Sequence, residues 1–159
     1  GKRQEYAEAG KEAWLNTSAG KTYTFKQSFI ATASAYIGTP YKYGSTNPNK
    51  GFDCSGLVYV SAKENQLSVP RSSSLMAHDA PHIPWKKAEM GDLVFFGSKS
   101  KIDHVAIVEK NKGRDLIVIH STTGRGVIRE NILESPYWKK RIRFAVPITA
   151  YQKGTIVKS

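Results

Sequence analysis

The chain has 159 residues, a formal net charge of +11 and one cysteine. This length suits one domain with a sizeable core, whereas the single cysteine excludes an internal disulfide, a CxxC redox centre and a multi-cysteine zinc site. The excess of 24 Lys+Arg over 13 Asp+Glu favours an anionic partner, which can be a nucleic acid, an anionic lipid or an acidic polymer.

The N-terminal part of the sequence predicts an extension followed by a core helix. Residues 1–24 are rich in Lys, Glu, Ala, Gly and Thr, and we expect one helix over about 3–15 within this extension. Apolar residues then recur at helical spacing from Phe25 to Ile37, and Gly38 ends the pattern. A main domain over 25–150 therefore begins with a buried helix.

The middle of the chain predicts a loop and two further helices. Residues 39–53 are dense in turn-forming Pro, Gly and Asn, which indicates an ordered loop. A second helix is expected to begin at Asp53 or Cys54, and a short third helix is expected over 72–77.

The second half of the sequence predicts strands. Its short runs are rich in Val, Ile and Phe and are separated by turn residues, which favours an α+β fold with N-terminal helices packed against a mostly antiparallel β-meander. Residues 151–159 are expected to form a C-terminal tail. The five predicted strands cover 92–97, 103–109, 115–121, 126–130 and 141–148.

The densest basic cluster, at 139–143, has two interpretations. Aromatic residues flank it, which is typical of some nucleic-acid surfaces. However, Arg141, Arg143 and Ala145 alternate with apolar residues, which predicts a strand with these three side chains facing water. We favour the strand, so nucleic acid is not the expected partner.

Cys54 also has two interpretations. A buried, inert thiol is the common fate of a free cysteine. A helix that begins at Asp53 or Cys54 would instead place the thiol at a helix N-terminus, where the dipole and unpaired N–H groups lower the thiol pKa. The small residues Ser55 and Gly56 leave room for a substrate, so we expect a thiolate that faces an open cleft.

A nucleophilic cysteine needs a base, and two histidines are candidates. His104 and His120 are equally distant from Lys112, at the centre of a predicted hairpin, so they are expected to be opposite partners. One imidazole can then orient the other as a general base. Two core histidines, or a metal site completed by Cys54, are the alternatives. His78 and His82 lie in a polar stretch and are expected at the surface.

Five ordered motifs resemble the NlpC-type cell-wall peptidases, which are bacterial papain-like cysteine enzymes. The resemblance covers about residues 28–148 and implies a papain-like fold and hydrolysis of peptide stems in peptidoglycan. The motifs are Gly38-Thr-Pro-Tyr-Lys-Tyr-Gly44, Gly51-Phe-Asp-Cys-Ser-Gly-Leu-Val58, Val69-Pro-Arg-Ser-Ser73, Gly91-Asp-Leu-Val-Phe-Phe96 and Asp103-His-Val-Ala-Ile-Val108.

The resemblance also implies a role for individual residues. Cys54 is then the nucleophile, His104 the general base and His120 the orienting residue, while the Tyr41 hydroxyl helps to hold the oxyanion. The family uses four further positions to bind the free amine and the D-glutamyl carboxylate of the stem peptide, although helix capping and a structural ion pair are equally open roles for them. These four residues are Asp53, Ser55, Arg71 and Ser73.

The function implied is a cysteine endopeptidase that cuts between D-γ-glutamyl and a diamino acid, either meso-diaminopimelate or lysine. An amidase or acyltransferase on the same scaffold, or a non-catalytic basic wall-binding protein, are the alternatives. No metal or organic cofactor is expected. We expect an exported monomer, in the periplasm, lipoprotein-anchored or extracellular, that contacts anionic wall polymer through its basic surface. A membrane anchor would lie in an N-terminal segment outside this sequence.

Overall fold

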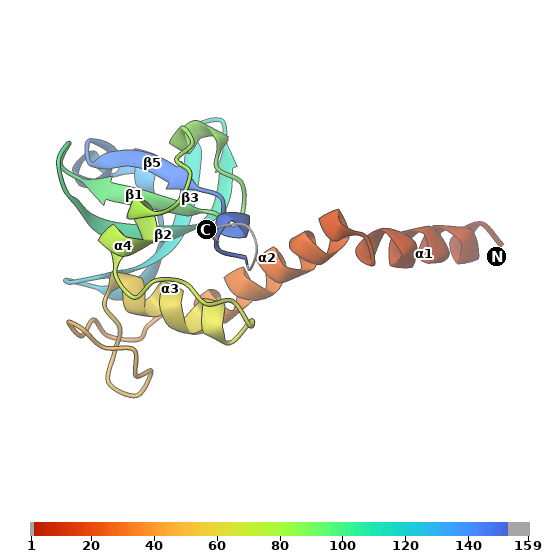
Figure 1. Cartoon of the computed structure of the whole chain (residues 1–159), viewed down its shortest axis with the longest axis horizontal. Helices are drawn as coiled ribbons and strands as arrows, with labels where there is room; N and C mark the ends of the chain where they lie inside the picture. The colour runs from red at the N-terminus through yellow and green to blue at the C-terminus, as the bar shows by residue number, and fades with distance from the viewer. Residues whose placement is uncertain (1, 153–159) are drawn as a thin grey trace.

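The computed structural model describes residues 2–152 (Figure 1). Its elements follow the predicted order, with helices first and strands afterwards. The helices are α1 (Lys2–Leu15), α2 (Ser18–Ala35), α3 (Cys54–Lys63), α4 (Ser73–His78) and α5 (Pro136–Lys139), with 3₁₀ turns at Trp85–Lys87, Ile132–Glu134 and Ile148–Tyr151. The strands are β1 (Leu93–Gly97), β2 (Ile102–Lys112), β3 (Asp115–Thr122), β4 (Gly126–Asn131) and β5 (Ile142–Val146).

The strands form one five-stranded sheet in the order β4-β3-β2-β1-β5. Every neighbouring pair is antiparallel, which confirms the predicted α+β architecture. Strands β1 to β4 make the expected meander. The last strand, β5, returns to pair with β1, so β1 and β2 lie in the middle of the sheet.

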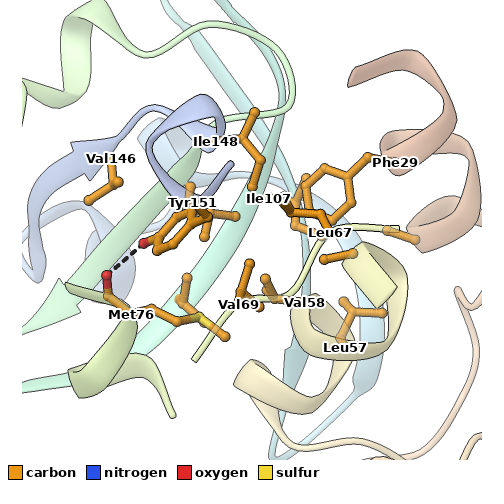
Figure 2. Packing of buried hydrophobic residues seen from close by; sticks show 14 of the residues in the cluster. Phe29, Leu57, Val58, Leu67, Val69, Met76, Ile107, Val146, Ile148 and Tyr151 are labelled. Carbon is orange, nitrogen blue, oxygen red and sulfur yellow. Dashed lines mark hydrogen bonds between the residues drawn. The ribbon is translucent and has the colours of Figure 1, made fainter. Parts of the chain in front are cut away.

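Apolar clusters cover both faces of the sheet. The larger cluster joins the helices to one face and includes Phe29, Leu57 and Ile107 (Figure 2). A second cluster on other strand positions includes Ala145, which is fully buried. The prediction that Ala145 faces water is therefore wrong, because this side of β5 packs in the second cluster instead of meeting solvent. The inner strand β1 is consequently buried at all five positions.

Helix α2 begins earlier than its apolar pattern indicated. It starts at Ser18, where the Thr17 side chain accepts a hydrogen bond of 3.1 Å from the Gly20 N–H, and not at Phe25. The first turns are polar and gave no apolar signal. The predicted boundary between residues 24 and 25 thus falls inside one continuous helix.

Helix α1 projects away from the body of the protein (Figure 1). None of its residues is buried. Within residues 2–152, no helix has both the length and the apolar character that crossing a membrane requires.

The end of the described chain packs into the core. Tyr151 is 4% exposed, and its hydroxyl donates a hydrogen bond of 2.6 Å to the Met76 carbonyl (Figure 2). This contact joins the last 3₁₀ turn to α4, so Tyr151 is part of the packed core and not of a tail. The remainder of the predicted tail, residues 153–159, lies outside the described residues.

Candidate active site

Cys54 is the first residue of α3, as the sequence predicted. Asp53 caps the helix by accepting a hydrogen bond of 2.6 Å from the Gly56 N–H. Gly56 is required here by space, because a Cβ atom on it would lie 2.2 Å from the Ser45 carbonyl oxygen. The loop before α3 and the first turn of α3 are therefore locked together around the thiol.

The Asp53 carboxylate also anchors a polar network. It accepts from the Gly44 N–H at 3.0 Å and forms an ion pair with Arg71 at 3.2 Å. Arg71 in turn donates to the Ser55 hydroxyl at 2.8 Å. Asp53 and Arg71 thus do have the capping and ion-pair roles that the sequence left open. Ser73 has no capping role, because Ser72 caps α4.

Burial dominates the electrostatics of the Cys54 thiol. Burial raises its pKa to about 11, and the neighbouring Asp53 also raises it, whereas backbone N–H groups of Val105, Ser55 and Cys54 itself lower it. The expected lowering by the helix N-terminus is therefore outweighed, and the prediction of a resting thiolate is wrong. The Cys54 thiol needs a base in order to react at neutral pH.

His104 and His120 meet, although not as opposite residues. Ile107 pairs with Ile119, and this register continued along the strands places His120 opposite Ala106. The strands turn at residues 113–114, later than the predicted centre at Lys112, because Lys112 pairs with Asp115. The β-bulge between Val108 and Lys110 takes back only one residue of this shift, so the prediction of opposite partners is wrong. The imidazoles meet diagonally instead, with 2.8 Å between His104 Nε2 and His120 Nδ1.

Two residues that the sequence analysis missed extend this contact. His120 Nε2 lies 2.8 Å from a carboxylate oxygen of Glu130, and Arg125 Nη2 donates to both Glu130 oxygens at 3.1 Å. Glu130 pairs across the sheet with Val118, two residues before His120. The residue directly opposite His120 is Ile128, so Glu130 reaches the imidazole diagonally.

Burial keeps both imidazoles neutral. It lowers the pKa of His104 well below its ordinary range, and His120 lowers it further. Burial also lowers the pKa of His120, although the hydrogen bond to Glu130 opposes this. Trp138 of α5 stacks on His104 with 4.4 Å between ring centroids, and this contact helps to enclose the pair. A neutral imidazole is the form that can accept a proton.

The thiol lies where two clefts meet. One cleft, of about 470 Å³, is lined by Tyr41, Cys54, His104, Arg125 and Trp138, among others. The other, of about 400 Å³, shares Tyr41 and Cys54 with the first. All four predicted substrate-binding residues line this second cleft, namely Asp53, Ser55, Arg71 and Ser73.

The structure also places Tyr41 and the remaining histidines. Burial and the nearby Cys54 raise the pKa of Tyr41, so its hydroxyl keeps the proton that it needs to donate a hydrogen bond. His120 is fully buried behind His104 and lines neither cleft. His78 and His82 are at the surface, as predicted. Within residues 2–152, no three His, Cys, Asp or Glu side chains are grouped to hold a metal ion.

Comparison with known proteins agrees with this geometry. The model of the NlpC/P60 family matches residues 38–146, which is more than half of the chain. The chain belongs to the NlpC/P60 family. The NlpC/P60 match includes both α3 and the hairpin that carries His104 and His120.

Curated NlpC/P60 relatives are longer than this chain. The bifunctional muramidase/DL-endopeptidase CwlT of Bacillus subtilis is 36% identical over 74% of this chain and 35% of its own length. The murein DD-endopeptidase MepH of Escherichia coli is 35% identical over 65% of this chain and 39% of its own length. The chain therefore spans little more than a third of either relative.

Solved structures of the NlpC/P60 family share the fold. The NlpC/P60 domain of the peptidoglycan hydrolase SagA has a TM-score of 0.64 and 29% identity, covering 76% of this chain and 97% of that one. A lipoprotein-like NlpC/P60 protein of Staphylococcus aureus has a TM-score of 0.67 and 29% identity, covering 79% of this chain and 41% of that one. These matches confirm the papain-like fold that the motifs implied.

Proposed function

We propose that the chain is a cysteine endopeptidase that hydrolyses peptidoglycan stem peptides, at the bond between D-γ-glutamyl and meso-diaminopimelate or lysine. The observation that carries this proposal is that Cys54, His104 and Tyr41 all line one cleft. The names of family relatives support it, since they include a DL-endopeptidase and a γ-D-glutamyl-L-lysine dipeptidyl-peptidase.

In the proposed reaction, the Cys54 sulfur attacks the scissile carbonyl carbon while the thiol proton passes to His104. The resulting oxyanion accepts hydrogen bonds from the Cys54 N–H and the Tyr41 hydroxyl. When the C–N bond breaks, His104 gives the proton to the leaving amine, and a thioester remains. Water then attacks the thioester with His104 as base, which releases the acid and restores the thiol. This sequence requires no metal or organic cofactor.

The second cleft supports binding of the acyl side of the stem peptide. Asp53 supplies a carboxylate and Arg71 a guanidinium within the same cleft as Cys54. A peptide end with a free amine and a carboxylate is complementary to such a pair. Arg71 is more accessible to a substrate than Asp53, because the Arg71 side chain is 36% exposed and the Asp53 side chain is 15% exposed.

The decisive test is digestion of purified muropeptides, with the products identified by mass spectrometry. We expect cleavage between D-glutamate and the diamino acid, with no cleavage by Cys54→Ala or His104→Ala. His78→Ala is the matched control, because His78 is exposed, pairs with Asp79 and lines neither catalytic cleft. Intact muropeptides after incubation with the unaltered chain would refute the proposal.

The same digestion tests the alternatives. One curated relative is named a γ-DL-glutamyl hydrolase, so poly-γ-glutamate should be included as a second substrate. Cleavage of that polymer alone would identify an amidase of another specificity on the same scaffold. Wall binding without any Cys54-dependent product would identify a binding protein.

Contact with anionic wall polymer fits one surface groove. This groove, of about 500 Å³, is lined by Lys99, Lys101 and Arg143, with Ser, His and apolar residues and no acidic side chain. It adjoins the active site in sequence, because Asp103 follows directly and lines both catalytic clefts. Such a site belongs to an exported protein that works on the cell wall, in the periplasm, lipoprotein-anchored or outside the cell.

A further inference from the structure

We propose that Glu130, held by Arg125, is a positioning residue that fixes which nitrogens of His104 and His120 carry protons. The inference rests on the proposed function, because it concerns the base of the same site. Three links carry it, namely His104 Nε2 to His120 Nδ1, His120 Nε2 to Glu130, and Glu130 to Arg125. The last two residues of this chain of bonds, Glu130 and Arg125, are not among the site residues that the sequence predicted.

The proton arrangement follows from what each atom can donate. An ionised carboxylate only accepts hydrogen bonds, so His120 Nε2 must carry the proton that it shares with Glu130. In a neutral imidazole the other nitrogen is then an acceptor, which makes His120 Nδ1 the acceptor from His104 Nε2–H. The one remaining nitrogen, Nδ1 of His104, is left with a free lone pair.

A lone pair on His104 Nδ1 is what a base for Cys54 requires. The Cys54 sulfur lies 4.0 Å from the carbonyl oxygen of Asp103, the residue just before His104, and both side chains line the same cleft. Without Glu130 the chain of bonds can reverse, with His120 Nδ1 donating to His104 Nε2. His104 Nδ1 would then carry a proton and could not accept another.

Arg125 helps to keep the Glu130 carboxyl group ionised. The hydrogen bond from His120, aided by Arg125, lowers the pKa of Glu130 and keeps it ionised. The Glu130 side chain is only 14% exposed, so its orientation is set by these two partners and not by water. Arg125 reaches Glu130 from the turn between β3 and β4.

The chain offers a matched control in the next ion pair along β4. Arg129 Nη2 donates to Glu109 at 3.1 Å, so this pair has the same chemistry and joins β4 to β2 across β3 in the same sheet. Its described partners are Glu109 and Ser34 and include no histidine. Loss of Glu109 therefore removes an ion pair without touching the proposed proton arrangement.

The test combines kinetics with ¹⁵N NMR of the histidine-labelled full chain, in which long-range ¹H–¹⁵N spectra identify each tautomer. Glu130→Met fills the same space without an acceptor, while Glu130→Gln keeps an acceptor oxygen. We expect Nε2–H tautomers for His104 and His120 in the unaltered chain and in Glu130→Gln, and mixed or reversed tautomers in Glu130→Met. The kcat of Glu130→Met should fall about tenfold to a hundredfold, while Glu109→Met stays unchanged.

Unchanged tautomers in Glu130→Met would overturn the proposal, as would equal kcat losses in Glu130→Met and Glu109→Met. If Glu130→Met does not fold, Arg125→Ala replaces it, because the Arg125 side chain is 60% exposed and its removal leaves the core intact. Mixed tautomers in Arg125→Ala then support the proposal, and unchanged tautomers refute it. Since the spectra need no substrate, they remain decisive even if the chain cleaves no muropeptide.

Discussion

At Cys54, the helix N-terminus and the surrounding protein act on the thiol in opposite directions. The N–H groups of the first turn favour the thiolate, but burial disfavours any charge and raises the pKa to about 11. A free thiol of this kind is almost wholly protonated at pH 7. The reactivity of Cys54 must therefore come from proton transfer to His104 and not from a resting negative charge.

Alkylation by iodoacetamide tests this dependence on His104. In His104→Ala, we expect the rate at pH 7 to fall by about tenfold or more. The rate should then rise steadily above pH 9, because the thiol must lose its proton unaided. Stopped assays across pH 6–11 measure the profile, with His78→Ala as control. Superimposable profiles for His104→Ala and the unaltered chain would contradict the prediction.

Among the elements, the first turn of α3 has no space for a side chain at Gly56. Gly56→Ala places a Cβ against the Ser45 carbonyl, which is backbone and cannot rotate away. We expect a loss of about 3 kcal/mol in the free energy of unfolding, together with displacement of the Asp53 cap. Urea denaturation measures the loss. Gly10→Ala in α1 is the control, because nothing lies within 4 Å of its added Cβ, and it should cause no loss.

The elements also show what the sequence could and could not predict. The start of α3 was predictable because Asp53 is a strong helix cap and apolar residues follow it. The start of α2 was not, because Thr17 caps a polar turn with no apolar period. The histidine register came out wrong because β2 runs on to Lys112 and pairs it with Asp115, so the turn lies at residues 113–114 and is not centred on Lys112.

The site residues that lie within short sequence motifs were predictable. Cys54, His104 and Tyr41 lie within family motifs, and the structure brings them to one cleft. Glu130 and Arg125 join His120 only through the pairing of β3 with β4, which is a tertiary fact. The burial that raises the Cys54 pKa was equally invisible, because it depends on which segments pack around the thiol.

Acid stability is a property of the whole molecule to which the buried site contributes. The folded pKa values of His104 and His120 lie below their ordinary value of 6.5, so below about pH 6.5 the unfolded chain takes up protons that the folded chain does not. Stability should therefore fall as pH drops through this range. The lowered pKa of Glu130 adds a further loss below its ordinary value of 4.5.

Thermal unfolding between pH 7 and 4 measures this dependence. We expect the Tm of the unaltered chain to fall on acidification, and the fall between pH 7 and 5 to be smaller in His104→Gln, which cannot titrate. The difference between the two chains removes the general effect of rising positive charge. Parallel curves for His104→Gln and the unaltered chain would contradict the assignment of the fall to His104.

The groove lined by Lys99, Lys101 and Arg143 is the part of the positively charged surface that we expect to bind cell-wall polymer. Lys99→Gln/Lys101→Gln should reduce retention on purified cell walls at about 50 mM salt, and the reduction should fade at high salt, where charges are screened. Lys2→Gln/Lys11→Gln removes the same charge from the projecting helix α1 and serves as control. Co-sedimentation measures both variants. Equal effects would show that total charge matters and not the groove.

The burial of β1 on both faces has a consequence for how the chain reaches its folded state. The segment Leu93-Val-Phe-Phe-Gly97 is apolar, uncharged and rich in residues that favour strands, which is the composition of aggregation-prone segments. In the folded protein, β2 and β5 cover its two edges. Because β5 is the last strand within residues 2–152, one edge of β1 stays unpaired until residue 146 has joined the sheet. Aggregation during refolding should therefore depend on how quickly β5 docks, and destabilising β5 should increase it.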